Sequence, residues 1–242
     1  MTIDNRYAGE EPPIIDCLLF DLDGRLYAIA NGYEQHCRDN LWRYMHTHLG
    51  VPEGQQEAIW RPLFQQYNQS LRALRAGGFD VQQEEYWDCL RAGAEHYLKP
   101  DPQVRALLKS LPQEKWVFTN CNEKHATHAL QLLGIEDQFK GVIGADTMGK
   151  SCKPEAAAFD AALHRTSSHP RYTAMVEDSV KNLRTAKSLG MTTVLVAGAT
   201  THEEAATQSD LDACVDAVVS QLIHKDFQNK VPQLWRHGQV QI

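Results

Sequence analysis

The feature that most constrains the fold is a largely apolar run over residues 14–20, followed at once by Asp21, Asp23 and Gly24. Such a run predicts a buried strand of a parallel sheet, and the chemistry of an open α/β sheet lies at the carboxyl ends of its strands. Two carboxylates two residues apart on an extended chain point the same way, and they repel each other unless a cation or a shared proton intervenes. The pair therefore indicates a bound divalent metal, although Asp and Gly in this order also suit a simple turn.

The length and the charge of the chain narrow its class. At 242 residues it can form one large domain, or a core with an insert. A net charge of -7 without a long basic run argues against a nucleic-acid partner, and no apolar stretch is long enough to cross a membrane. The six cysteines are scattered without a Cys-x-x-Cys pair, and residues 1–13 lack a secretory signal. These features favour reduced thiols and a cytoplasmic location.

The segment after the first predicted strand has a helical pattern throughout. We expect three helices, the second with a possible break at Pro62, over residues 33–49, 55–76 and 82–97. The sequence Lys-Pro-Asp-Pro at residues 99–102 predicts a hinge. The expected domains are an α/β core, residues 1–27 and 101–242, and an inserted all-helical cap, residues 28–100.

From residue 101 onward, predicted strands and helices alternate. The expected strands are 116–118, 142–144, 172–176, 192–196 and 216–219, and the expected helices are 102–111, 123–133, 154–165 and 180–189. The helix over 154–165 begins with Pro154, which suits a first helical turn. This alternation predicts a doubly wound, Rossmann-like parallel sheet. Residues 224–242 show no clear period, and we expect them to lie on the surface of the core.

Polar residues cluster directly after the predicted strands or in nearby loops. The clusters are Asp21 with Asp23, Thr119 with Asn120, Lys153, and Glu177 with Asp178. Because the carboxyl ends of parallel strands share one edge, these clusters are expected to converge. They supply a nucleophile, an acid/base, anion-binding groups, a cation and metal ligands, the components of phosphoryl transfer. Each cluster alone could be a helix cap or a solvated loop residue, but four such coincidences around one sheet are improbable.

The same stretches resemble the haloacid dehalogenase superfamily, whose signature is an Asp-x-Asp motif, a Thr or Ser, a Lys and a closing acidic pair. The closer resemblance is to the pyrimidine 5′-nucleotidase-like branch, which carries a helical cap. It rests on residues 20–27, 98–101, 115–120, 125–126, 132–135, 152–154 and 177–179 with Asn182.

The resemblance implies a role for each residue. Asp21 is expected to be the nucleophile that forms an aspartyl-phosphate, and Asp23 the general acid and base. Mg²⁺ is expected on the Asp21 carboxylate, the Asp23 backbone carbonyl and the Asp178 carboxylate, with Glu177 reaching it through water. Phosphate oxygens are expected on Thr119 and the amide of Asn120, and Lys153 is expected to neutralise charge on the nucleophile and the phosphate.

One residue departs from the superfamily pattern. Arg25 stands where a threonine usually follows the Asp-x-Asp motif, at a position that stabilises the loop. The presence of Asp23 argues against a true haloacid dehalogenase, which lacks an acid/base at this position.

The sequence therefore predicts a Mg²⁺-dependent phosphomonoesterase. The expected partner is a small phosphorylated metabolite, with a nucleotide monophosphate favoured, and neither a nucleic-acid polymer nor a membrane; a homodimer remains open. The alternatives are a sugar-phosphate phosphatase, a phosphomutase, and an inactive scaffold that binds a phospho-ligand or a protein. Substrate choice is expected to come from the cap, with Tyr33 and Tyr67 as candidates.

Overall fold

The centre of the molecule is a parallel sheet. The computed structural model of the chain describes residues 13–197 and 207–235, and within them six strands pair in the order β3-β2-β1-β4-β5-β6. The strands are β1 (Cys17–Phe20), β2 (Glu114–Phe118), β3 (Gly141–Ile143), β4 (Thr173–Glu177), β5 (Thr192–Val196) and β6 (Ala217–Val219). Every neighbouring pair is parallel, so the predicted doubly wound sheet is confirmed.

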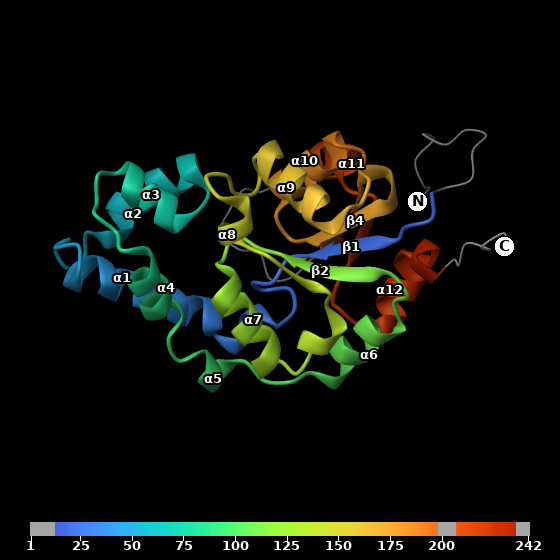
Figure 1. Cartoon of the computed structure of the whole chain (residues 1–242), viewed down its shortest axis with the longest axis horizontal. Coiled ribbons are helices and arrows are strands. Elements are labelled where there is room, and N and C mark those ends of the chain that lie inside the picture. The colour runs from blue at the N-terminus through green and yellow to red at the C-terminus, as the bar shows by residue number, and fades with distance from the viewer. Residues whose placement is uncertain (1–12, 198–206, 236–242) are drawn as a thin grey trace.

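Helices cover both faces of this sheet (Figure 1). The helices outside the cap are α6 (Pro102–Ser110), α7 (Glu123–Leu132), α8 (Ala145–Met148), α9 (Ala156–Thr166), α10 (Val180–Ser188), α11 (Gln208–Cys214) and α12 (His224–Lys230). Successive side chains of a strand point to opposite faces. Accordingly, Leu18 and Phe20 pack with the apolar residues of α6, α7 and α12, whereas Leu19 packs with those of α9 and α10. Strands buried on both faces explain the near-continuous apolar runs of the sequence.

Strand β1 lies in the middle of the sheet, between β2 and β4. The chain proceeds from β1 to β2 and β3 on one side, and then returns to β4 on the other side. In α/β sheets, ligands bind at the carboxyl ends of the strands beside such a reversal of direction. Asp21 directly follows β1, and its backbone N–H donates to the carbonyl oxygen of Val176 at 3.0 Å.

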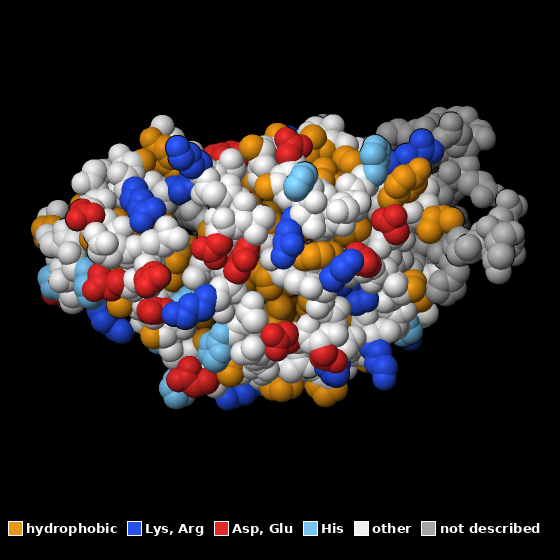
Figure 2. Space-filling model, in the orientation of Figure 1, with side chains coloured by type: hydrophobic (Ala, Val, Ile, Leu, Met, Phe, Trp, Pro, Cys, Tyr) orange, Lys and Arg blue, Asp and Glu red, His pale blue; other side chains and the backbone are white. Residues whose placement is uncertain are grey.

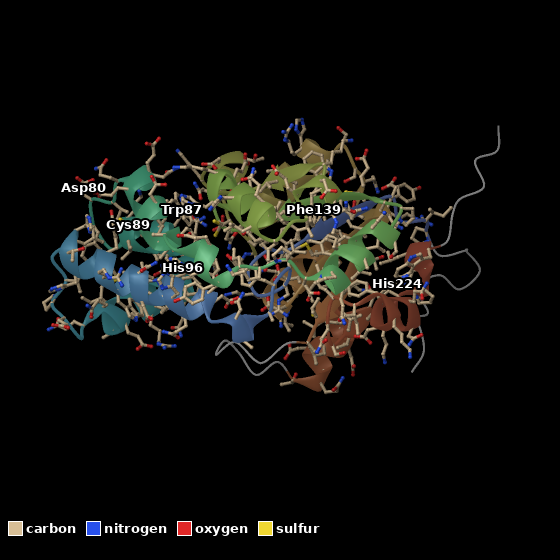
Figure 3. The ribbon with its side chains drawn as sticks, turned by 90° about the horizontal axis from the view of Figure 1, so that it is seen from below. Asp80, Trp87, Cys89, His96, Phe139 and His224 are labelled. Atoms are coloured by element: carbon tan, nitrogen blue, oxygen red, sulfur yellow. The ribbon has the colours of Figure 1, made fainter. Side chains whose placement is uncertain are left out.

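Residues 28–100, called the cap from here on, contain helices and no strand among the part of the chain that the structure describes. The helices are α1 (Tyr33–Thr47), α2 (Gln56–Tyr67), α3 (Ser70–Ala76), α4 (Gln83–Arg91) and α5 (Ala94–Tyr97). They bury an apolar core of their own that includes Trp60 and Trp87. Figure 3 shows Trp87 and Cys89 on the cap side of the molecule and Phe139 on the side of the sheet.

Three predicted helix boundaries are wrong. The helix expected over 55–76 breaks at Asn68, whose φ of 56° is left-handed, and it continues through Pro62, which is exposed and lies inside α2. The helix expected over 82–97 is interrupted by Gly93, with a φ of 80°. Pro154 lies in a turn before α9 and does not open that helix.

The C-terminal segment also differs from its prediction. Where the sequence suggested a surface position for residues 224–242, the side chains of Phe227, Val231 and Leu234 are fully buried in the core against one face of the sheet. The described part of this segment is only twelve residues long, 224–235, which is too short for a clear period to emerge. Residues 236–242 lie outside the described residues.

Neither sign of charge dominates the one face of the molecule that Figure 2 shows. Acidic and basic side chains are interspersed on the face shown in Figure 2. Among residues 13–197 and 207–235, no helix combines the length and the apolar character needed to cross a membrane.

Candidate active site

The four polar clusters predicted from the sequence meet at the carboxyl edge of the sheet. Asp21 follows β1, Thr119 follows β2, and Glu177 ends β4 with Asp178 next to it. Lys153 comes from the loop between α8 and α9. The order β2-β1-β4 makes the first three strand ends neighbours, which is why residues far apart in sequence share one site.

Lys153 is the centre of the cluster. Its side chain is 2% exposed, and Nζ donates to Asp21 Oδ1 at 2.6 Å, to Glu177 Oε2 at 2.8 Å and to the Phe118 carbonyl oxygen at 2.8 Å. Burial by itself would lower the pKa of Lys153, but the two carboxylates outweigh it and raise the pKa above its ordinary value. Lys153 therefore remains a cation while wholly enclosed.

Glu177 anchors this lysine. Burial would raise its pKa, but the charge of Lys153 and hydrogen bonds outweigh that effect and lower the pKa to about 2. Its Oε1 accepts from the backbone N–H groups of Asp178 and Ser179, and its Oε2 accepts from Lys153 and from Asn182 Nδ2 at 3.0 Å. Both oxygens of Glu177 are thus already engaged, which favours a structural role. A water-mediated contact with a metal remains a prediction.

The carboxylates of Asp21, Glu177 and Asp178 form the acidic cluster at which the metal was predicted. One oxygen from each lies within 4.8 Å of the others. Burial and the nearby charge of Glu177 raise the pKa of Asp21 to about 7 and that of Asp178 to about 9. When ionised, the three carboxylates outnumber the two cations bonded to them, Lys153 and Arg25. A hard divalent cation with a preference for oxygen ligands fits this donor set. The expected contribution of the Asp23 carbonyl stays a prediction.

Asp23 has a different environment from Asp21. Arg91, the last residue of α4 in the cap, donates from Nη1 to Asp23 Oδ1 and from Nη2 to Asp23 Oδ2, both at 2.8 Å. Tyr27 Oη adds a hydrogen bond to Oδ1 at 2.7 Å. Burial would raise the pKa of Asp23, but the charge and the hydrogen bonds of Arg91 outweigh it and lower the pKa. Sequence reasoning missed Arg91, because nothing local distinguishes it from the other arginines of the cap.

Arg25, the departure from the superfamily pattern, is part of the site. Its side chain is 2% exposed; Nη2 donates to Asp178 Oδ2 at 2.7 Å, and Nη1 donates to the Val196 carbonyl oxygen at 2.8 Å. The guanidinium therefore links the loop after β1 to the ends of β4 and β5. The guanidinium bonds Oδ2 of Asp178 and leaves Oδ1 available. In this chain the long side chain of Arg25 thus stabilises the loop where the superfamily usually has a threonine.

Thr119 and Asn120 occupy the loop after β2. Thr119 is 1% exposed, its backbone N–H donates to the Ile143 carbonyl, and its Oγ1 accepts from the Cys121 N–H at 3.0 Å. A hydroxyl that accepts one hydrogen bond still has a proton to donate, so Thr119 can act as a donor. The Asn120 side chain instead holds the loop of Lys153: Oδ1 accepts from the Lys153 N–H at 2.8 Å, and Nδ2 donates to the Lys153 carbonyl at 3.0 Å.

The cap reaches the same loop through the turn between α2 and α3. Gln69 Nε2 donates to the Asn120 carbonyl at 2.7 Å, and Asn120 Nδ2 donates to the Asn68 carbonyl at 3.2 Å. Lys181 Nζ donates to Asn68 Oδ1 at 2.9 Å. Of the two tyrosines considered for substrate contact, Tyr33 is buried with its ring against that of Tyr27, at 5.7 Å between centroids.

The fold and the site define a class: a Rossmann-like α/β protein with a helical insert and with a buried Asp–Lys–Glu cluster at the centre of its sheet edge. Residues 18–196 match the family model of the haloacid dehalogenase-like hydrolases, and the chain belongs to this family. The predicted superfamily is thereby confirmed. The match spans β1 to β5, and so includes every residue of the cluster.

Individual relatives are distant. Phosphate metabolism protein 8 of Saccharomyces cerevisiae is 26% identical over 213 residues, which cover 78% of this chain and 64% of that protein. This chain thus spans less than two thirds of the length of that relative.

Solved structures of low identity share the fold. A HAD phosphatase from Thermococcus onnurineus superposes with a TM-score of 0.61 at 20% identity, covering 89% of this chain and 97% of that one. The L-2-haloacid dehalogenase from Xanthobacter autotrophicus, with chloropropionic acid covalently bound, gives a TM-score of 0.52 at 19% identity, covering 82% and 81%.

Proposed function

We propose that this protein is a phosphomonoesterase that acts through an aspartyl-phosphate. The observation that carries the proposal is Lys153, which is buried within hydrogen-bond distance of both Asp21 and Glu177. A cation in this position lowers the electrostatic cost of bringing an anionic ester to an anionic carboxylate, and charge stabilisation of this kind dominates phosphoryl transfer. Thr119 and the amide of Asn120 supply neutral donors for the phosphate oxygens.

The proposed reaction has two steps. In the first, an Asp21 oxygen bonds to phosphorus while the bond from phosphorus to the leaving oxygen breaks, and Asp23 gives that oxygen a proton. In the second, water attacks the phosphorus of the aspartyl-phosphate, Asp23 accepts a proton from this water, and the bond to Asp21 breaks. Inorganic phosphate and an alcohol are released, and both aspartates return to their starting state.

Asp23 separates this proposal from the dehalogenases that share the fold. A dehalogenase releases a halide, which needs no proton, whereas an alkoxide leaving group does. Asp23, two residues after the nucleophile, supplies the carboxyl group that phosphate ester cleavage requires as an acid/base; in this structure Tyr27 and Arg91 hold it in its ionised form.

Mg²⁺ is the proposed cofactor, held by the Asp21 and Asp178 carboxylates and the Asp23 carbonyl. When bound, it would supply positive charge to the phosphoryl oxygens and to the nucleophile. The excess of three carboxylates over the two cations bonded to them, Lys153 and Arg25, supports this choice.

The proposed substrate is a small phosphorylated metabolite in the cytoplasm, with nucleotide monophosphates supported by the resemblance to the pyrimidine 5′-nucleotidase branch. Sugar phosphates and phosphomutase activity are the alternatives within enzymes, and an inactive scaffold is the alternative outside them. The net charge of -7, and the interspersed charges on the face shown in Figure 2, support neither a nucleic-acid polymer nor a membrane as partner.

The test is a screen for phosphate release over nucleotides, sugar phosphates and aryl phosphates with Mg²⁺. Release that disappears in the Asp21→Asn variant supports the proposal. An absence of phosphate release from every ester would favour the inactive scaffold, and isomerisation of a sugar phosphate without release would favour the mutase.

A further inference from the structure

Arg91 is a cap residue whose charged group is enclosed at the active site. Its side chain is 12% exposed and lies near the ring of Tyr33, with 5.9 Å between the guanidinium carbon and the ring centroid. The two terminal nitrogens of its guanidinium form a fork, and each donates one hydrogen bond to the carboxylate of Asp23. Its Nε is buried, and it has no hydrogen-bond partner among residues 13–197 and 207–235.

This arrangement is incompatible with the work proposed for Asp23. The two oxygens of Asp23 already accept three hydrogen bonds, from the two Nη atoms of Arg91 and from Tyr27. To approach the leaving oxygen of a bound ester, Asp23 must break at least one of its hydrogen bonds to Arg91. The freed N–H groups of a buried guanidinium then need another acceptor, because leaving them unpaired is costly.

The position of Arg91 indicates which part of a substrate it meets. Lys153 belongs to the core and bonds the nucleophile, on the side where the transferred phosphoryl group is proposed to bind. Arg91 approaches Asp23 from α4 of the cap. Since Asp23 is proposed to contact the bridging oxygen, Arg91 lies toward the leaving group.

We propose that Arg91 selects the substrate of the proposed phosphomonoesterase by binding an acidic group on the leaving-group side, either a carboxylate or a second phosphate. The planar fork of a guanidinium matches both groups with two parallel hydrogen bonds. Binding such a group replaces the carboxylate of Asp23 as the partner of Arg91 and frees Asp23 for the leaving oxygen. The inference rests on the proposed function and assigns leaving-group choice to Arg91 in place of Tyr33 and Tyr67.

The inference ranks substrates differently from the resemblance. An ester that carries an acidic leaving group should be cleaved better than a nucleoside monophosphate or an aryl phosphate, since the last two present only neutral groups beyond the bridging oxygen. Phosphoglycolate provides a carboxylate, and a sugar bisphosphate provides a second phosphate. Comparing kcat/KM for these two substrates shows whether Arg91 favours a carboxylate or a second phosphate.

The experiment measures kcat/KM with Mg²⁺ for phosphoglycolate, a sugar bisphosphate, uridine monophosphate and nitrophenyl phosphate. Arg91→Met removes the fork at similar length, and Arg91→Lys keeps the charge without the fork. Asp88→Asn is the matched control, because Asp88 lies on the same helix and binds Lys124 and His125 of α7, away from Asp23.

The expected result in Arg91→Met is a loss of roughly 10- to 100-fold in the kcat/KM of an acidic ester relative to that of a neutral ester, with a smaller relative loss in Arg91→Lys. Asp88→Asn should leave the ranking of the four esters intact. The inference is overturned if Arg91→Met lowers all four esters by the same factor, or if the wild-type protein prefers a neutral ester.

A binding measurement keeps this test separate from the test of catalysis. The Asp21→Asn protein lacks the nucleophile, so calorimetry with Mg²⁺ can compare phosphonoacetate, which carries a carboxylate, with inorganic phosphate. Tighter binding of phosphonoacetate that is lost when Arg91→Met is added supports the role of Arg91, even if no ester is hydrolysed. Equal binding of both anions, with or without Arg91, contradicts it.

Discussion

The side chain of Asn120 holds the main chain of Lys153 at two points, with Oδ1 accepting from its N–H at 2.8 Å and Nδ2 donating to its carbonyl at 3.0 Å. This pair joins the loop after β2 to the loop before α9. It fixes the backbone from which the Lys153 side chain reaches Asp21. The sequence predicted that the Asn120 amide would bind phosphate; the structure adds that its side chain positions the lysine.

The first prediction follows from this pair. Asn120→Asp keeps the shape and the acceptor but loses the donor to the Lys153 carbonyl, so it should lower kcat for every ester by roughly 10-fold while changing substrate ranking little. Steady-state kinetics over several esters measure this effect. A change confined to one substrate would show that Asn120 acts on the leaving group instead.

The second prediction concerns the nucleophile. Asp21→Asn should reduce turnover by several orders of magnitude, on the order of the loss seen when covalent nucleophiles are removed, since a neutral amide cannot form the aspartyl-phosphate. Phosphate release from an aryl ester with Mg²⁺ measures it. Thermal unfolding of the variant serves as the folding control. Turnover near that of the wild type would refute the mechanism.

The third prediction concerns pH and the metal. Folding raises the pKa of Asp21 to about 7 and of Asp178 to about 9 from a usual value of 3.8, so the folded state keeps protons that the unfolded chain releases. Metal-free protein should therefore lose stability as the pH rises from about 4 to about 9. Mg²⁺ competes with these protons, and its stabilisation should grow over the same range.

Thermal unfolding with Mg²⁺ or with EDTA, at about pH 6 and about pH 9, checks this expectation. Asp178→Ala removes the carboxyl with the higher pKa and should weaken both the Mg²⁺ shift and its dependence on pH. EDTA should also abolish activity, and Zn²⁺ should restore it poorly because the site offers only oxygen ligands. A Mg²⁺ shift that is equal at both pH values would contradict the assignment of the raised pKa to the metal ligands.

The fourth prediction compares the core with the cap. Lys153→Met should depress kcat/KM for all esters together, because Lys153 bonds the nucleophile and not the leaving group. The variant should also unfold more easily, since Asp21 and Glu177 would lose the buried cation between them; breaking such a pair costs about 3–5 kcal/mol. Denaturant unfolding with Mg²⁺ present provides the stability measurement. Selective loss of one ester would place Lys153 in substrate discrimination.

The fifth prediction tests the C-terminal helix. Phe227 is fully buried, so Phe227→Ala should lower the free energy of unfolding by about 3–5 kcal/mol. Its exposed neighbour provides a control: Gln228→Ala should change it by less than about 0.5 kcal/mol. Urea unfolding followed by circular dichroism measures both. Similar values for the two variants would show that α12 contributes little to the core.

Local sequence patterns were sufficient to predict the strands of the sheet, but not the residues at which the helices begin and end. The apolar runs predicted the strands because a strand buried on both faces must be apolar along its length. The break at Asn68 was missed, because a single non-glycine residue with a left-handed φ leaves no pattern in the sequence. It matters for the site, because the turn it creates brings Gln69 to the carbonyl of Asn120.

The sequence by itself determined the α/β core, the helical insert and the residues of the acidic cluster. It could do so because the strand ends that carry Asp21, Thr119 and Glu177 are brought together by parallel topology alone. Only the tertiary structure decided which charges pair. Arg91 meets Asp23 across 68 residues and Arg25 meets Asp178 across 153, and no periodicity or motif records contacts at such separations. These pairings depend on how the cap packs on the core and how β4 and β5 lie beside β1, so they become visible only in three dimensions.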